Sequence, residues 1–128
     1  MIEFTIPLPP ITKKNSQRIV RCGKSFRVLP SEPYQRYEEA ALKLLPRQRP
    51  LIEWPVEVKA LFYMPTRRRV DLTNLLEALD DVLVKARILD DDNCRIIASH
   101  DGSRVLYDKT NPRTEVTITR IEDVRGGG

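Results

Sequence analysis

The chain has 128 residues, of which 41% are hydrophobic and 31% are charged, and its net charge is +4. This length fits one domain with a real core, and the composition is ordinary for a globular protein. No apolar run is long enough to cross a bilayer, and the N-terminus lacks the features of a signal peptide, so we expect a cytoplasmic protein without a membrane partner. Cys22 and Cys94 have no zinc-ligand spacing and are interpreted as free thiols.

The first expected element is a half-buried strand within residues 1–8, where apolar and polar residues alternate. Pro9-Pro10 ends this strand, because proline has no N–H to donate to a sheet. The polar loop that follows contains Lys13 and Lys14. These lysines are candidates for binding DNA phosphates, and an exposed turn explains them equally well.

A basic hairpin is expected next. Residues 18–22 and 25–29 predict two short strands, and Gly23-Lys24 between them is typical of a tight turn. The basic side chains suit contact with a DNA duplex. They equally suit an edge strand that carries charge to prevent aggregation.

A helix and a central strand are expected after the hairpin. Ser31 is the predicted N-cap of the helix, and Pro46 is expected to stop it. Tyr34 and Tyr37 recur at helical spacing and are assigned to the core rather than to base stacking. Residues 56–63 alternate and carry a largely apolar second face, which predicts a strand in the middle of the sheet.

The main helix is expected to begin after Asp71, whose carboxylate is predicted to cap the first turn. At about 100° per residue, an apolar stripe roughly 120° wide faces the core. The stripe consists of Leu72, Leu75, Leu76, Leu79, Val82, Leu83 and Ala86. Asn74, Glu77 and Asp81 cluster on the far side, where Val84 breaks the pattern and is assigned to a second layer or a partner subunit.

Opposite charges gather at the two ends of this helix. Three arginines precede it and three carboxylates follow it: Arg67, Arg68, Arg69, Asp90, Asp91 and Asp92. Arginines bind backbone phosphates, and carboxylates hold the divalent cations that support phosphodiester cleavage. The alternative is a helix cap and a solvated turn. Asp71 and Asp92 are far apart along a straight helix, so a shared metal requires the acidic segment to return to Asp71 or to come from a second subunit.

Three more strands are expected after the helix, over residues 95–98, 104–107 and 114–121. His100 is the only histidine, and no local motif supports it as a catalytic base, so it is interpreted as structural or solvated. We expect one domain over residues 1–123 and a disordered tail over residues 124–128.

The charged segment resembles the RusA family of Holliday-junction resolvases. The family motif is an arginine-rich strand end, then D-L-D-N, a helix and D-D, and its counterparts here are Arg67-Arg68-Arg69, Asp71-Leu72-Thr73-Asn74 and Asp91-Asp92. The opening I-P-L-P-P and the K-K-N segment match as well. The resemblance implies a homodimeric α/β (α+β) fold, a small mixed sheet with two main helices packed on it. It further implies cleavage of four-way DNA junctions with Mg²⁺ or Mn²⁺ in recombination and repair, in a bacterium, phage or prophage.

The resemblance also implies the site residues. Asp71, Asp92 and Asp91 are the metal and catalytic candidates. Neighbours in an extended segment point to opposite faces, so only one of Asp91 and Asp92 is expected to be a ligand, and the resemblance favours Asp92. DNA contacts are expected from Arg67, Arg68, Arg69, Lys13, Lys14 and Asn74.

Two departures from the motif leave a second hypothesis open. Thr73 stands where the family has a carboxylate, and Glu77 stands where its best-known members have a lysine. Glu77 is a catalytic candidate because it restores a negative charge, and Asp81 is another possible substitute. The alternative to a nuclease is a branched-DNA-binding protein that has lost its chemistry with the carboxylate at position 73; an RNA nuclease is less favoured.

Overall fold

The computed structural model describes residues 1–13, 17–30, 32–45 and 50–121. The described elements, in chain order, are β1 (Ile2–Ile6), β2 (Gln17–Cys22), β3 (Ser25–Pro30), α1 (Glu32–Leu44), β4 (Val56–Met64), α2 (Leu72–Lys85), β5 (Ile97–Ser99), β6 (Arg104–Tyr107) and β7 (Arg113–Arg120). The expectations for Lys14, for the cap at Ser31, for the stop at Pro46 and for the tail at 124–128 lie outside the described residues.

The described strands other than the hairpin form one mixed sheet with β4 in its interior. β1 pairs antiparallel with β7, and β7 pairs antiparallel with β4. Two short strands share the other edge of β4: β5 pairs parallel with its start at Val56, and β6 pairs parallel with its end from Leu61 to Met64. The predicted α+β fold and the predicted central strand are therefore confirmed.

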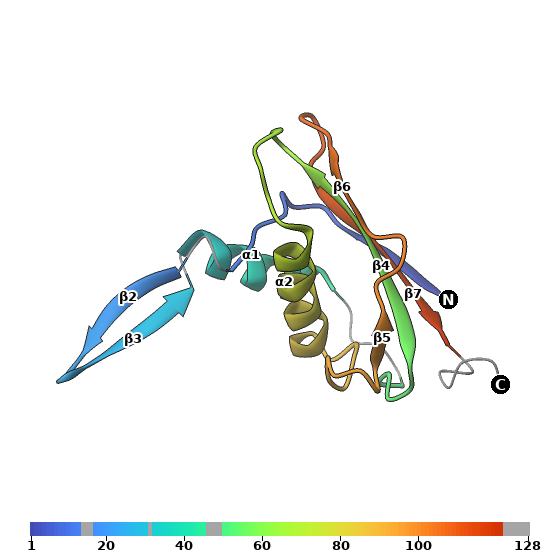
Figure 1. Ribbon diagram of the computed structural model, residues 1–128, viewed down its shortest axis with the longest axis horizontal. Coiled ribbons are helices and arrows are strands. Elements are labelled where there is room, and N and C mark those ends of the chain that lie inside the picture. Colours follow the sequence, from blue (N-terminus) through green and yellow to red (C-terminus); the bar gives the residue numbers. More distant parts are fainter. Residues whose placement is uncertain (14–16, 31, 46–49, 122–128) are drawn as a thin grey trace.

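The core lies between this sheet and the two helices, which Figure 1 shows on the same side of the sheet. Along β4, every second residue from Val56 to Phe62 is buried, as the alternation predicts. Tyr34 and Tyr37 of α1 are buried in the same core, as predicted.

Helix α2 packs its predicted apolar stripe into the core. All of the stripe is buried except Leu72, which is partly buried and packs against the core. Val84, which breaks the pattern, is also partly buried against the same core. Its position off the stripe therefore needs neither a second layer nor a partner subunit.

The β2–β3 hairpin is confirmed and projects away from the body of the molecule (Figure 1). Gly23 lies in its turn with a φ of 63°, a conformation that glycine adopts without a steric cost. Phe26, beside the turn, is 71% exposed.

Strand β5 begins two residues later than predicted. The carbonyl of Asn93 accepts hydrogen bonds from the N–H groups of Ile96 and Ile97, at 3.0 and 2.9 Å. This turn occupies the residues before Ile97 and delays the start of the strand.

Candidate functional site

Asp71 lies at the start of α2, where the loop from β4 meets the helix. Its carboxylate makes no capping hydrogen bond, so the predicted side-chain cap is wrong. The backbone carbonyl of Asp71 instead accepts from the N–H groups of Asn74 and Leu75, at 3.1 and 3.2 Å. The exposed carboxylate accepts a hydrogen bond from the side-chain amide of Asn74 at 3.2 Å, and within the described residues it forms no ion pair.

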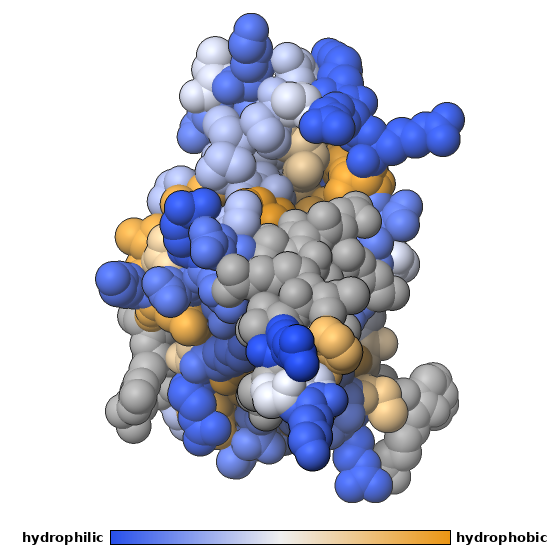
Figure 2. All heavy atoms as spheres, turned by 90° about the vertical axis from the view of Figure 1, so that its left-hand side faces the viewer, coloured by the Kyte–Doolittle hydropathy of each residue, from blue (hydrophilic) through white to orange (hydrophobic). Residues whose placement is uncertain are grey.

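Three arginines lie in the loop that leads to Asp71. Arg67, Arg68 and Arg69 are all exposed, and none of them pairs with a carboxylate in the described ranges. The guanidinium of Arg67 lies over the ring of Tyr107, 4.2 Å from its centroid. Figure 2 shows hydrophilic side chains standing around smaller hydrophobic patches near the upper end of the molecule, where this loop lies in Figure 1. The start of α2 therefore offers unpaired positive charge, which suits a phosphate.

The opposite end of α2 is held by backbone contacts. Arg87, directly after the helix cap Ala86, has a φ of 61°. This left-handed conformation is costly for a residue with a side chain, and it turns the chain out of the helix. The N–H of Ile52 then donates to the carbonyl of Ile88 at 3.0 Å, and the N–H of Asp90 donates to the carbonyl of Ile52 at 2.9 Å. These bonds fix the acidic segment against the chain that enters β4.

Within this segment, Asp91 and Asp92 are used differently. The Asp91 carboxylate accepts from the N–H of Asp92 at 2.7 Å and from the amide of Asn93 at 2.9 Å. These hydrogen bonds lower the pKa of the Asp91 carboxyl. Asp92 is exposed and forms no ion pair in the part of the chain that the structure describes. Asp91 therefore shapes the turn, whereas the Asp92 carboxylate faces solvent.

One chain does not bring these carboxylates together. Helix α2 has 14 residues from Leu72 to Lys85, so Asp71 precedes its first residue and Asp92 follows its last in the chain. A helix of this length measures roughly 20 Å. Among the described residues, no group of three or more Asp, Glu, His or Cys side chains is arranged to hold a metal ion. Asp71 and Asp92 therefore belong to no such group within the described residues of one protomer.

The comparison with protein families matches residues 7–119 to the model described as endodeoxyribonuclease RusA. The chain belongs to the RusA family. Members of the family are Holliday-junction resolvases, so membership implies an endonuclease that acts on branched DNA. No curated protein matches the chain. No helix in the described residues is long and apolar enough to span a membrane.

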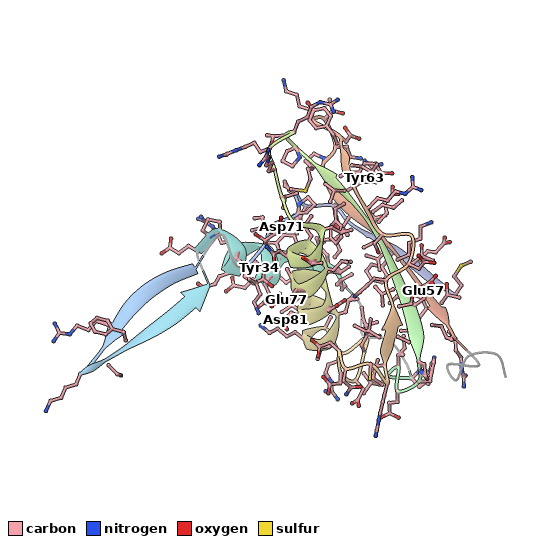
Figure 3. All side chains as sticks on the ribbon, in the orientation of Figure 1. Tyr34, Glu57, Tyr63, Asp71, Glu77 and Asp81 are labelled. Atoms are coloured by element: carbon pink, nitrogen blue, oxygen red, sulfur yellow. The ribbon has the colours of Figure 1, made fainter. Side chains whose placement is uncertain are left out.

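The RusA-family chain uses Lys13 and Asp81 in a contact between distant segments. The Lys13 ammonium forms an ion pair with the Asp81 carboxylate and lies 5.9 Å from the centroid of the Tyr34 ring. This contact ties the N-terminal segment to α2 and occupies both charges. Glu77 is exposed on α2, and Figure 3 shows it between Asp71 and Asp81 along the helix. Of the two proposed substitutes for the missing carboxylate, Glu77 is the one without an ion pair among the described residues.

A half-buried pair that the sequence did not predict lies midway along α2. Nε2 of His100 lies 2.9 Å from Oδ2 of Asp80, and Nδ1 lies 2.8 Å from the backbone oxygen of Val58. Burial raises the pKa of the Asp80 carboxyl, and the hydrogen bond to Asp80 raises the pKa of His100. The pair links α2 to β4, which confirms the structural interpretation of His100.

One sequence signal points to this pair. Asp80 lies about 40° from the edge of the apolar stripe by helical geometry, so its carboxylate borders the core. Its side chain is only 13% exposed. A carboxylate in that position needs a buried donor, and the only histidine of the chain is a candidate.

Proposed function

We propose that this protein is a metal-dependent endonuclease that cuts the phosphodiester backbone of branched DNA, with four-way junctions as substrates. The observation that carries the proposal is the state of Asp71. Its carboxylate is free of a capping role and of ion pairs in the described residues, and it follows three unpaired arginines. A free carboxylate beside phosphate-binding side chains is the combination that metal-assisted cleavage requires.

Asp71 and Asp92 are the proposed ligands of Mg²⁺ or Mn²⁺. Both are exposed carboxylates without a cationic partner in the described ranges, and oxygen donors are what these hard cations prefer. The bound metal would neutralise the scissile phosphate and lower the pKa of a water molecule. Asp91 would hold the turn that presents Asp92, and Asn74 would orient the carboxylate of Asp71 through its hydrogen bond.

We further propose that the site is shared between two protomers. The length of α2 separates Asp71 from Asp92 in one chain, so Asp71 of one protomer would meet Asp92 of the partner subunit. A two-fold dimer would then carry two equivalent sites, matching the two-fold symmetry of a four-way junction. The arginines at the start of α2 would bind the phosphates on either side of the cut.

A second candidate function rests on Thr73. This residue is exposed in the first turn of α2 and supplies no carboxylate where the family motif has one. The alternative protein binds branched DNA and does not cut it.

A nicking assay separates the two functions. A labelled four-way junction is incubated with the protein in Mg²⁺, in Mn²⁺ and in excess chelator, with an RNA junction as a further arm. The nuclease proposal expects nicks in either metal and intact DNA with chelator. Tight junction binding in chelator with no nicks under either metal would support the binder and reject the nuclease.

A further inference from the structure

A notch next to the arginine loop has no assigned ligand. It has a volume of about 390 Å³ and is lined by Met64, Thr66, Arg67, Arg68, Val105 and Tyr107, with the neighbouring Leu106. We call it the Arg67–Tyr107 notch. Its lining combines two basic side chains with an aromatic ring and aliphatic groups, and it contains no carboxylate.

The register between β4 and β6 fixes which way the notch faces. Val105 lies opposite Phe62, and Tyr107 lies opposite Met64. Paired residues share a face of a sheet, so Val105 and Tyr107 point to the side where the buried Phe62 meets the core. Helix α2 begins only at Leu72, and Val105 and Tyr107 are 38% and 39% exposed. The notch is therefore an extension of the helix-covered face that neither α1 nor α2 covers.

A comparison of Arg67 with Arg113, another arginine that stacks on a tyrosine of the sheet, shows that the charge of Arg67 is not neutralised by a carboxylate in the described residues. The guanidinium of Arg113 lies 3.8 Å from the centroid of the Tyr63 ring, and it also pairs with Asp108 and Glu115, at 2.9 Å each. Carboxylates thus satisfy that arginine within the protein. Arg67 stacks on Tyr107 in a similar way but has no carboxylate partner in the described part of the chain. Its charge is available to a ligand.

Flat aromatic and guanidinium surfaces are the platforms on which proteins stack unpaired bases. Arg68, exposed at the rim, can bind the phosphate attached to such a base. Asp71 follows Arg68 by three positions, so the chain between them spans at most about 11 Å. A base in the notch would therefore belong to a nucleotide close to the phosphate held at Asp71.

We propose that the Arg67–Tyr107 notch binds one unstacked nucleobase of the cleaved DNA strand. This inference rests on the proposed action on branched DNA and adds a source of selectivity to it. Bases at a branch point leave the stack more easily than bases inside a duplex, because less stacking and pairing is given up. Occupation of the notch thus favours branched DNA over an intact duplex.

The test measures binding and base stacking in chelator, where no cleavage competes. Junctions carry the fluorescent base 2-aminopurine at each position within two nucleotides of the branch, and a matched duplex serves as the second substrate. The variants are Tyr107→Ala and Tyr107→Trp. Tyr63→Ala is the matched control. It also removes a tyrosine ring that carries an arginine, Arg113, but this ring lies on the opposite face of β4. Thermal melting confirms that each variant is folded.

The proposal expects one 2-aminopurine position to change its emission on binding. Tyr107→Ala should abolish that change and weaken junction binding about 10-fold, as removal of one base–aromatic stack does, with duplex binding unchanged. Tyr107→Trp should retain both properties, as should Tyr63→Ala. The notch assignment would be overturned if Tyr107→Ala kept the wild-type emission change and affinity. It would also be overturned if the variant bound junction and duplex equally more weakly than the wild type.

Failure of the notch and failure of the proposed function give different results. If the wild-type protein nicks junctions in Mg²⁺ and Tyr107→Ala behaves like the wild type, only the notch assignment is wrong. If the wild-type protein neither binds nor nicks junctions, the proposed function is wrong and the notch assignment falls with it.

Discussion

The two ends of helix α2 differ in how their charges are used. At the start, Asp71 and the arginines of residues 67–69 are exposed and unpaired in the described residues, and the backbone alone caps the helix. At the other end, backbone bonds through Ile52 and hydrogen bonds to Asp91 hold the acidic segment in a defined turn. One end is open to an anion, and the other presents carboxylates from a fixed support.

The helix dipole sharpens this contrast. The start of a helix carries a partial positive charge and favours phosphate, whereas the end carries a partial negative charge. Burial, and then the nearby negative charge of Asp92, raise the pKa of the Asp80 carboxyl, so Asp92 lies where a further negative charge is unfavourable. A divalent cation would relieve that repulsion, so the same placement that costs stability without metal favours metal binding. The proposed catalytic site needs both ends, and two protomers would supply them.

The largest expected effect comes from removing either proposed metal ligand. Asp71→Asn and Asp92→Asn should each reduce nicking of a four-way junction about 1,000-fold or more, as removal of a group acting directly at the reaction centre does. Asp101→Asn, at an exposed carboxylate in the turn before β6, is the control and should cut normally. Asp92→Asn should melt at the same temperature as the wild type or higher, because it removes a negative charge that lies near the Asp80 carboxyl. Normal nicking by Asp92→Asn would remove the acidic end from the site.

The next effect concerns the open end. Replacing Arg67, Arg68 and Arg69 together by alanine should weaken junction binding about 100-fold near physiological salt, because each arginine bound to a phosphate releases counterions. The slope of log affinity against log salt should fall by about 1 for each phosphate that is no longer bound. Arg95→Ala, in the exposed segment after the acidic turn, is the matched control. An equal change of slope in Arg95→Ala would mean that the two ends bind phosphate alike.

A smaller effect is expected midway between the ends, at the Asp80–His100 pair. His100→Ala should lower the free energy of unfolding by about 2 kcal/mol at pH 6, because Asp80 is left buried without its charged hydrogen-bond donor. Junction affinity per folded molecule, measured in chelator, should stay the same, since neither side chain of the pair is a proposed DNA contact. Denaturant unfolding measures the first quantity and filter binding the second.

The same pair predicts a dependence of stability on pH. The pKa values of Asp80 and His100 are both raised from their ordinary values of 3.8 and 6.5, so the folded state holds protons that the unfolded chain releases. The free energy of unfolding should therefore fall as pH rises above 3.8 and again as it rises above 6.5. His100→Ala should remove the second decline. A second decline that persists in His100→Ala would assign it to another group.

The smallest effect is expected at the turn out of α2. Arg87→Gly should raise the free energy of unfolding by about 0.5 kcal/mol, because glycine relieves the cost of the left-handed conformation but loses more chain entropy on folding. Nicking should be unchanged if the left-handed turn alone positions the acidic segment. A lower melting temperature would show that the side chain of Arg87 contributes more than its backbone strain costs.

The parts of the fold set by local periodicity were predictable from the sequence. The alternation of residues 56–63 and the apolar stripe of α2 each follow from the repeat of one element, and the structure has both. Contacts between distant segments do not follow from local periodicity. The Lys13–Asp81 ion pair and the Asp80–His100 pair depend on how α2 packs against other elements. The predicted helix cap by the Asp71 side chain is wrong for a local reason, because the amide of Asn74 donates a hydrogen bond to that carboxylate.

The most direct test of the shared site is complementation between two inactive variants. Asp71→Asn and Asp92→Asn are mixed under conditions that allow subunit exchange, with different tags so that the mixed dimers can be isolated. If Asp71 of one protomer works with Asp92 of the partner subunit, each mixed dimer keeps one intact site, and random mixing should restore about a quarter of wild-type nicking. A mixture in which tagged subunits co-purify but nicking stays at the level of each variant alone would contradict the shared site.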